Sequence, residues 1–260
     1  GTIGDASFCS LQWSKPATTG LGGIALINTP ELIEPIKAVV DTYSEPSTSM
    51  VFVLRALSWS FDIFYRPRLY WFVRRAYQAI ARLGFVQGSS SEQELTSGFM
   101  PVDYRERYGK ARRAQANKAM NRIADCIEHR RRLASRYRRA LAPSGCLMMP
   151  TLDKSLPSPL RFPLLVTDRV RLLREARAAK IELGDWFNAP LHPEESNASC
   201  FGYTDGDCPH AEFAARHMIN LPTLKHVSER EAGRIIKFIL DRQYLLMDVS
   251  SFIPQTDDAP

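Results

Sequence analysis

The sequence predicts an α/β protein, and three observations carry that prediction. The first is a pair of short apolar runs, "ASFCSLQ" and "GGIALIN", between residues 6 and 28. The second is a basic segment with helical periodicity over 104–141. The third is a block over 146–245 in which apolar runs alternate with capped amphipathic segments. With 260 residues, 45% of them apolar, the chain has the length for one large or two modest domains.

The two apolar runs predict two strands joined by a tight connection, because Pro16 and Gly20 lie between them and Gly22 and Gly23 begin the second run. A helix is predicted to follow. Thr29 is its expected N-cap, and Pro30 occupies its first position, where a missing N–H costs nothing. Together these elements form the first predicted region, 1–43.

Residues 44–100 are predicted to form an insertion of apolar, arginine-rich helices, broken at Pro67. Between 50 and 86 the arginines are interleaved with tryptophan, phenylalanine and tyrosine, a mixture suited to a membrane interface with the rings at headgroup depth. Two interpretations stay open, namely peripheral membrane contact through 50–86 and helices packed on the protein or its dimer partner. Salt-sensitive binding to anionic vesicles that is lost on deleting 50–86 would distinguish them.

Residues 104–141 are predicted to form one long basic helix that connects the first region of the chain to the last. Between Tyr104 and Arg139 there are 13 Lys or Arg against 3 Asp or Glu, whereas the whole chain carries a net charge of +6. Its apolar positions recur mostly every three or four residues, which indicates one buried stripe and a cationic outer face. That face is either simply solvated or faces an anionic ligand or membrane surface. No nucleic-acid partner is expected, because no zinc-finger spacing or RNA-binding signature accompanies the charge.

Residues 146–245 are predicted to form a compact α/β domain, followed by a tail over 246–260. The expected strands are "LRFPLLV" and "IELGDWF". Asp168 is the expected N-cap of a helix that runs to Ala179, and Ser228 that of the helix "EREAGRIIKFILDRQ".

Composition excludes several classes of protein. Five cysteines without a CxxC pair favour reduced, mostly buried thiols over a disulfide framework or a zinc site, so we assign no metal ligand. No stretch approaches the roughly 18 apolar residues of a membrane span. The first residues, "GTIGDASFCS", lack the layout of a secretory signal, so we expect a cytoplasmic protein.

The stretch "SLQWSKPATTGLGG" contains the candidate catalytic residue, Lys15. This lysine follows the end of a predicted strand and precedes a turn whose glycines permit positive φ angles and close approach of the backbone to a ligand. A solvated surface lysine is one interpretation. The other is a lysine that carries a Schiff base, which requires a partly desolvated amine that attacks an aldehyde and afterwards moves a proton.

This stretch, within "GDASFCSLQWSKPATTGLGGIALINTPEL", resembles the lysine segment of the DegT/StrS family of sugar aminotransferases, which are pyridoxal-phosphate enzymes of fold type I. Two later stretches, "PLRFPLLVTDRVRLLREARAAKIELGDWFNAPLHP" and "GDCPHAEFAARHMINLPTLKHVSEREAGRII", resemble the family's small C-terminal domain. The resemblance covers residues 1–43 and 104–243. It implies the last part of a large, mostly parallel-sheet domain, a long connecting helix and a small C-terminal α/β domain.

The resemblance also implies pyridoxal 5'-phosphate as the cofactor and a role for four residues. Lys15 would form the imine and move the proton, and Ser10 would donate to the cofactor phosphate. Arg105, in "DYRERYG", lies where the family usually has an asparagine that reaches the phosphate across a dimer; a guanidinium can bind a phosphate, although a surface arginine is the alternative. His192, in "PLHP", lies in a loop that often faces substrate, with a structural histidine as the alternative.

In this family the phosphate-binding loop, the aromatic residue on the pyridine ring and the carboxylate at the pyridine nitrogen lie well upstream of the lysine, and here 14 residues precede it. We therefore expect the C-terminal part of a homodimeric aminotransferase that uses glutamate to aminate a nucleotide-linked keto sugar, and we expect the chain alone to be inactive. The alternative is a non-catalytic pseudoenzyme or membrane-peripheral subunit that retains the small domain.

Overall fold

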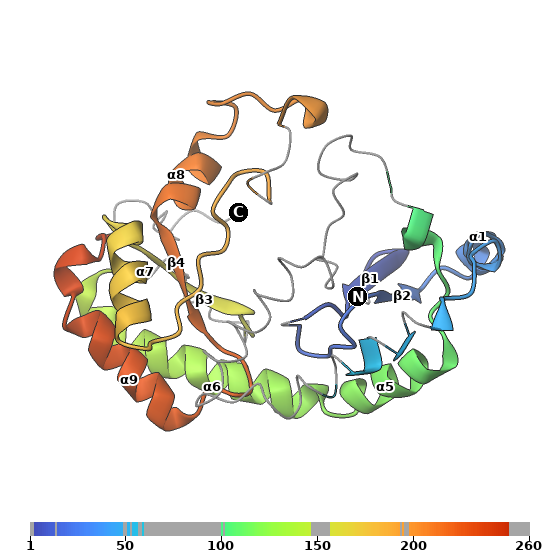
Figure 1. The fold of residues 1–260 in the computed structure, drawn as a ribbon, viewed down its shortest axis with the longest axis horizontal. Helices are drawn as coiled ribbons and strands as arrows, with labels where there is room; N and C mark the ends of the chain where they lie inside the picture. The colour runs from blue at the N-terminus through green and yellow to red at the C-terminus, as the bar shows by residue number, and fades with distance from the viewer. Residues whose placement is uncertain are drawn as a thin grey trace. The chain divides into compact units, whose positions relative to one another are not determined.

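The structure, a computed structural model, consists of two compact units, Gly1–Cys126 and Ile127–Pro260 (Figure 1). It describes residues 3–13, 15–48, 51–52, 54–56, 59, 100, 102–146, 157–192, 194 and 198–249. Within these residues each unit contains one two-stranded sheet. Most of the predicted 44–100 insertion, including Pro67 and nearly all of 50–86, lies outside the described residues.

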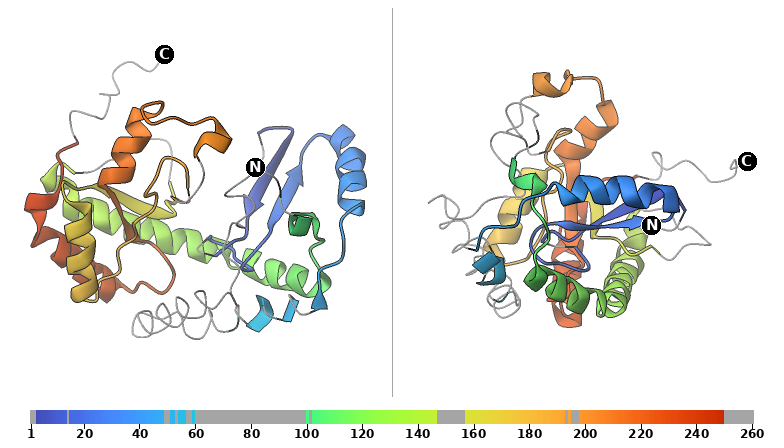
Figure 2. Two further views of the ribbon diagram at one scale, coloured as in Figure 1. Left: turned by 45° about the horizontal axis from the view of Figure 1, so that its top comes forward. Right: turned by 90° about the vertical axis from the view of Figure 1, so that its right-hand side faces the viewer.

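The first unit is built on the hairpin formed by strands β1 (Ala6–Ser10) and β2 (Gly23–Ile27). The strands are antiparallel, with Ala6 opposite Ile27 and Ser10 opposite Gly23 (Figure 2). This confirms the two predicted strands and their glycine-rich connection. Most residues of both strands are exposed, including Phe8 at 86%. The unit therefore leaves apolar side chains of its hairpin uncovered.

A short 3₁₀ turn, η1 (Pro30–Leu32), leads into helix α1 (Ile33–Asp41). Pro30 begins this turn as predicted. Thr29 is the N-cap residue of this turn, as predicted, although its side chain makes no capping hydrogen bond. Its hydroxyl instead donates to Oδ1 of Asp5 at 2.8 Å, and its N–H donates to the Asp5 carbonyl at 3.1 Å. Thr29 thus ties the end of β2 to the residue before β1.

The basic segment forms two helices, so the prediction of one helix over 104–141 was wrong. A 3₁₀ turn, η2 (Val102–Arg105), precedes helix α5 (Lys110–Met120), and α6 (Ile123–Leu141) follows after a break. The backbone N–H of Arg107 donates to the Ser44 carbonyl, and Ser44 N–H donates to the Arg105 carbonyl, so this stretch pairs with Ser44 instead of forming a helical turn. Asn121, a weak helix former, ends α5.

The second unit contains the antiparallel strands β3 (Arg161–Leu165) and β4 (Met218–Pro222). Its other helices are α7 (Arg169–Ala178), α8 (Pro209–His217) and α9 (Glu229–Leu240), with 3₁₀ turns η3 (Ala142–Ser144), η4 (Ala198–Phe201) and η5 (Gln243–Leu245). The predicted strand "LRFPLLV" is confirmed as β3. Both predicted caps are confirmed, because Asp168 accepts from Arg171 N–H and Ser228 accepts from Glu231 N–H.

The second strand of this unit differs from the predicted one. "IELGDWF" forms no strand, and its backbone pairs with the sheet at Gly184, which exchanges two backbone hydrogen bonds with Asn220 of β4. There is no room for a side chain at Gly184, since a Cβ there would lie 2.7 Å from Nη1 of Arg161. The strand that pairs with β3 is β4. It is a short apolar run, and periodicity alone does not distinguish a strand of this length from a buried turn of helix.

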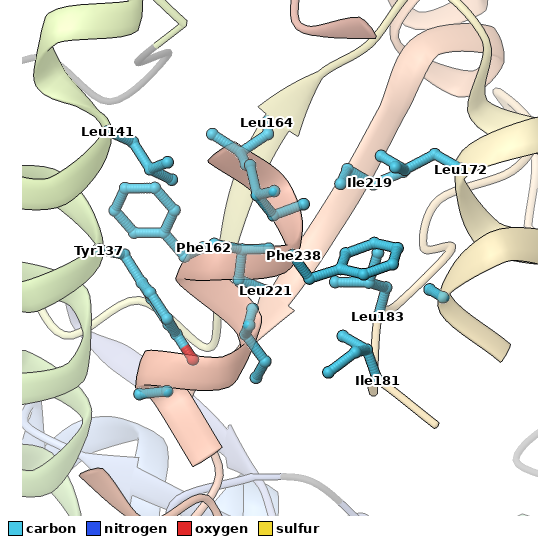
Figure 3. Packing of buried hydrophobic residues seen from close by; sticks show 14 of the residues in the cluster. Tyr137, Leu141, Phe162, Leu164, Leu172, Ile181, Leu183, Ile219, Leu221 and Phe238 are labelled. Atoms are coloured by element: carbon cyan, nitrogen blue, oxygen red, sulfur yellow. The ribbon is translucent and has the colours of Figure 1, made fainter. Parts of the chain in front are cut away.

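The core of the second unit lies between the β3–β4 sheet and helices α6, α7 and α9 (Figure 3). Tyr137 and Phe162 pack with ring centroids 5.6 Å apart, and the Tyr137 hydroxyl donates to the buried Pro222 carbonyl at 2.9 Å. Burial raises the pKa of Tyr137, so it remains a neutral donor. The buried Arg130 donates through Nη1 to the Leu160 carbonyl at 2.8 Å. This unit therefore has a complete core of its own.

Leu221 lies at the centre of this core and is fully buried. We expect Leu221→Ala to lower the free energy of unfolding of the second unit by about 2–5 kcal/mol, because it removes apolar contacts and leaves a cavity. Urea denaturation of the full chain followed by circular dichroism measures this loss. The control Val170→Ala, on the exposed face of α7, should stay within about 0.5 kcal/mol of the parent. Equal losses in the two variants would contradict the packing described here.

The five cysteines are all free, as expected, but they are not mostly buried. Cys146 alone among them is buried, Cys126 is partly exposed, and Cys9, Cys200 and Cys208 are exposed. Among the described residues, no helix has the length and apolar character to cross a membrane.

Candidate functional site in the lysine loop

Lys15 lies in the loop over 11–22 that joins β1 to β2, and this loop is anchored on both sides of the lysine. Leu11, 1% exposed, and Ala17 pack against Ala116 of α5. Leu11 N–H donates to the Gly22 carbonyl and Thr19 N–H donates to the Leu11 carbonyl, both at 2.9 Å. Lys15 is therefore held between two buried apolar anchors while remaining partly exposed itself.

Two glycines give the loop its shape. Gly20 has φ of +88° and Gly22 has φ of +94°, in the left-handed region that L side chains rarely adopt. A Cβ on Gly20 would lie 2.8 Å from the Trp13 ring, and a Cβ on Gly22 would overlap the Tyr108 ring. The predicted positive φ angles are thus confirmed, and the close approach is to two aromatic rings.

Tyr108 holds the far side of the loop through Thr19. The Thr19 hydroxyl donates to the Leu21 carbonyl at 3.0 Å, so its oxygen is left to accept from the Tyr108 hydroxyl. The guanidinium carbon of Arg112 lies 4.8 Å from the centre of the Tyr108 ring. Burial raises the pKa of Tyr108, and this effect outweighs the opposing effects of the Thr19 hydrogen bond and the Arg112 charge. The phenol therefore stays protonated at neutral pH and keeps donating.

The lysine itself is fixed through its backbone. Lys15 N–H donates to the Gln12 carbonyl at 3.3 Å, and within the described parts of the chain its side-chain nitrogen has no hydrogen bond or ion pair. The hydroxyl oxygen of Ser10 accepts from Gln12 N–H at 3.4 Å, which leaves the hydroxyl hydrogen to donate to a ligand. The hairpin therefore carries an amine in its loop, on Lys15, and a hydroxyl donor at the end of β1, on Ser10.

The other two predicted site residues lie elsewhere. Arg105 is exposed, and it lines a groove of about 560 Å³ together with Ala38 and Val39 of α1. His192 belongs to the second unit, where it contacts the rings of Trp186 and Phe187. Of the four predicted residues, Ser10 and Lys15 belong to one hairpin, with Ser10 at the end of β1 and Lys15 in the loop that follows.

Sequence reasoning missed the residues that hold the loop, namely Thr19, Tyr108 and Arg112. Tyr108 is part of the stretch "DYRERYG" in which Arg105 was selected, but nothing local indicates that a tyrosine there reaches Thr19, 89 positions away. Gly20 and Gly22 were the available signal, because a glycine can mark a place where another group lies close to the backbone. In the structure each of them faces an aromatic ring that a side chain would displace.

We expect Gly22→Ala to open the lysine loop. The variant combines a strained φ with an overlap on Tyr108, and strain of this kind costs about 1–3 kcal/mol, so chymotrypsin should cleave at Trp13 roughly tenfold faster or more. The control Gly206→Ala has a similar φ of +100° but no atom within 4 Å, and it should leave cleavage at Trp13 unchanged. Cleavage of Gly22→Ala at Trp13 at the rate of the parent would contradict the loop geometry described here.

The chain resembles solved structures of known fold, and a family profile matches most of its second half. Its fold is that of fold-type I aminotransferases, and it covers about half of the solved chains that it resembles. The profile of the DegT/DnrJ/EryC1/StrS aminotransferase family matches residues 80–240, more than half of the chain. The chain therefore belongs to the DegT/DnrJ/EryC1/StrS aminotransferase family, as the resemblance predicted.

Three solved structures illustrate the likeness. A DegT DnrJ EryC1 StrS aminotransferase from Brucella abortus is 17% identical with a TM-score of 0.62, over 94% of this chain and 52% of that one. Spr1654 of Streptococcus pneumoniae, described as a sugar aminotransferase and solved in its PMP form, is 14% identical with a TM-score of 0.60, over 94% and 54%. DesI, solved in the presence of its TDP-sugar product, is 16% identical with a TM-score of 0.58, over 94% and 50%.

The chain thus spans about half the length of the solved structures that it resembles. A sequence comparison with the curated proteins found no match.

Proposed function

We propose that this chain contributes the lysine and the small domain of a pyridoxal-phosphate-dependent aminotransferase that transfers the amino group of glutamate to a nucleotide-linked keto sugar. The observation that carries the proposal is the place of Lys15, a partly exposed amine on a loop that is anchored on both sides. The family profile matches residues 80–240 and so does not include Lys15. The role of the lysine therefore rests on its motif and on the geometry of its loop.

The residues of the loop fit two ends of pyridoxal phosphate. The side-chain nitrogen of Lys15 suits the aldehyde carbon, and the hydroxyl of Ser10, with its hydrogen not used toward Gln12, suits the phosphate. The same hairpin offers nothing for the pyridine nitrogen, because residues 6–27 contain no Asp or Glu. The carboxylate for that nitrogen must come from another part of the active enzyme.

When bound, pyridoxal phosphate supplies the electron sink that allows a proton to leave the carbon bearing the amino group. The residues of this chain bind it and move the proton. Lys15 would hold the aldehyde end of the cofactor until the amino group of the substrate replaces it there. The released amine would then take the proton at Nζ and return it at the neighbouring position. Ser10 holds the phosphate, and the Tyr108–Thr19 hydrogen bond keeps the loop and its lysine in one position.

Two further residues complete the proposed site. Arg105 would bind the cofactor phosphate of a dimer partner, since its guanidinium is exposed and suits a phosphate oxygen pair. His192 would face the sugar substrate, because it is exposed on a loop of the small domain. A nucleotide-linked sugar as substrate is supported by DesI, whose structure was solved with its TDP-sugar product.

Transfer of a labelled amino group tests this function. The complete enzyme, loaded with pyridoxal phosphate and given ¹⁵N-glutamate with a panel of nucleotide-linked keto sugars, should move ¹⁵N to one of the sugars. Mass spectrometry of the nucleotide sugar detects the label. Absence of transfer to every sugar, with every amino acid offered as donor, would favour the alternative of a non-catalytic subunit.

Peripheral membrane contact through residues 50–86 is a separate proposal, supported by the arginine and aromatic pattern of that stretch. It stays a prediction, as does the cytoplasmic location. Co-sedimentation with anionic vesicles, compared between the full chain and one lacking 50–86, tests it. Binding that is unchanged after the deletion would contradict it.

A further inference from the structure

An open groove of about 610 Å³ lies between helices α6 and α9 of the second unit, which run side by side (Figure 1). Ion pairs of Glu229 with Arg132 and Arg136 join the two helices at the start of α9. The apolar part of the groove's lining consists of Ala140, Ile236 and Leu240. Leu240 is 37% exposed. The groove therefore leaves apolar surface uncovered by the described residues, within a unit whose core is complete.

Cations line the same groove. Arg139 and Lys237 are exposed, and neither forms an ion pair with any residue in the described ranges. Arg136 is a third cation, whose charge is balanced by Glu229. The acidic group among the lining residues is Asp241. An apolar surface edged by cations suits an occupant that is both apolar and acidic, since complementary charge selects the partner.

The described part of the second unit ends close to the end of α6. Val249 is 1% exposed, and its N–H donates to the Gly145 carbonyl at 3.0 Å. Gly145 comes five positions after Ala140, so the Cα atoms of these two residues are at most ~18 Å apart. Residues 250–260 add up to ~36 Å of extended chain to Val249. This segment, which lies outside the described residues, is therefore long enough to reach the groove.

The sequence of this segment, "SSFIPQTDDAP", suits the groove. Phe252 and Ile253 are large apolar residues, and the segment contains no Lys or Arg. Its acidic pair is Asp257 and Asp258. Asp257 lies eight positions beyond Val249, an extended reach of ~26 Å. The acidic pair can thus come within reach of the cations on the last turns of α6 and α9.

We propose that the groove binds residues 250–260 of the same chain. In the bound state the acidic pair lies against Arg139 and Lys237, and apolar side chains of the segment cover Leu240. An exposed ion pair contributes little by itself. A tethered segment, however, has an effective concentration on the order of millimolar, so a contact too weak to hold a separate peptide is enough to hold this one. The inference does not depend on the proposed function, because it uses the second unit alone.

Zero-length cross-linking tests this proposal, because a carbodiimide joins a carboxylate to a lysine amine only where the two are in contact. The full chain is treated at low salt, and peptide mass spectrometry maps the products. We expect Asp257 or Asp258 to be joined to Lys237. Lys180 and Lys225 are exposed in the same unit but do not line the groove, and each should give several times less product.

Charge reversal at the groove is the second measurement. Arg139→Glu should lower the yield of the Lys237 product roughly fivefold, since an attractive exposed pair becomes a repulsive one. The matched control Arg177→Glu also reverses an exposed arginine in the last turn of a helix, and it should leave the yield unchanged. Lys237→Arg keeps the charge but cannot be joined, so the product should disappear while chymotrypsin cleaves after Phe252 as slowly as in the parent. Arg139→Glu should speed that cleavage.

Equal yields at Lys180, Lys225 and Lys237 in the parent would overturn the proposal, and this comparison needs no variant. A product that joins ¹⁵N-labelled to unlabelled chains in a mixed sample would overturn it in favour of a second copy. A Lys237 product that is absent until vesicles of anionic phospholipid are added would overturn it in favour of a membrane surface. An unchanged yield in a folded Arg139→Glu variant would contradict the charge pairing on which the proposal rests.

Discussion

Replacing Lys15 by alanine is expected to abolish amino transfer in the complete enzyme, with kcat reduced by at least the roughly 10²–10⁴-fold that a positioned proton-transfer group contributes. The loss has two physical causes, because the same nitrogen binds the cofactor and moves the proton. The fold should be unaffected, since the side chain of Lys15 is partly exposed and has no polar partner among the residues that the structure describes. Single-turnover kinetics with a saturating amino donor measures the effect.

Lys15→Arg should fail as completely as Lys15→Ala, because a guanidinium stays protonated and does not form the bond to an aldehyde carbon. This variant keeps the positive charge and so separates the chemistry from electrostatics. The control Lys37→Ala removes an exposed lysine of α1 that pairs with Glu34, and it should retain full activity. Appreciable activity in Lys15→Arg would remove the lysine from its proposed role.

The second large effect concerns the 260-residue chain by itself, which we expect neither to bind pyridoxal phosphate at one equivalent per chain nor to catalyse amino transfer. The chain spans about half the length of the solved structures it resembles. Its hairpin leaves Phe8 exposed and its outer strand edges unpaired within the described residues, and uncovered edges and apolar faces of this kind favour association over a defined site. The residues of the hairpin also include no carboxylate for the pyridine nitrogen.

Equilibrium dialysis with pyridoxal phosphate, followed by absorbance spectroscopy, measures this directly. The second unit should give a cooperative unfolding transition in the same sample, since its core is complete, and this serves as the control for a folded protein. One equivalent of cofactor bound by this chain with no second polypeptide present would show that it contains a self-sufficient site, contrary to our account.

Local signals in the sequence were sufficient for much of the fold. The hairpin followed from two apolar runs around a glycine-rich turn, and its geometry confirms both strands. Asp168 and Ser228 were identified as caps because a side-chain oxygen before an amphipathic run satisfies a free N–H of the first turn. In these cases the residues that determine the structure are neighbours in the sequence.

Features that depend on distant contacts were not predictable in the same way. The start of α5 at Lys110 depends on backbone pairing of Arg105 and Arg107 with Ser44, more than 60 positions away. Thr29 is the N-cap residue that was predicted, but the hydrogen bond from its hydroxyl to Asp5, 24 positions away, was not predictable from its neighbours. Similarly, "IELGDWF" has the pattern of a strand, whereas β4 occupies the place beside β3.

In the candidate site, too, the features set by neighbouring residues could be predicted and those set by distant contacts could not. Lys15 and Ser10 were selected from one motif, and the structure places them on one hairpin; their roles stay predictions. Tyr108 was not, since its partner Thr19 comes into reach only when the loop packs on α5. The position of the segment around Trp186 was not predictable either, because it depends on Asn220 and Arg169, which lie on β4 and α7 and meet this segment only in the folded unit.

The most direct test of the central claim is to locate the cofactor. The complete enzyme, incubated with pyridoxal phosphate and reduced with borohydride, should carry one phosphopyridoxyl group per chain, and peptide mass spectrometry should place it on Lys15. The Lys15→Ala variant should carry none under the same conditions. A group found on any other lysine, or an unlabelled Lys15 in an enzyme that is active, would contradict the account.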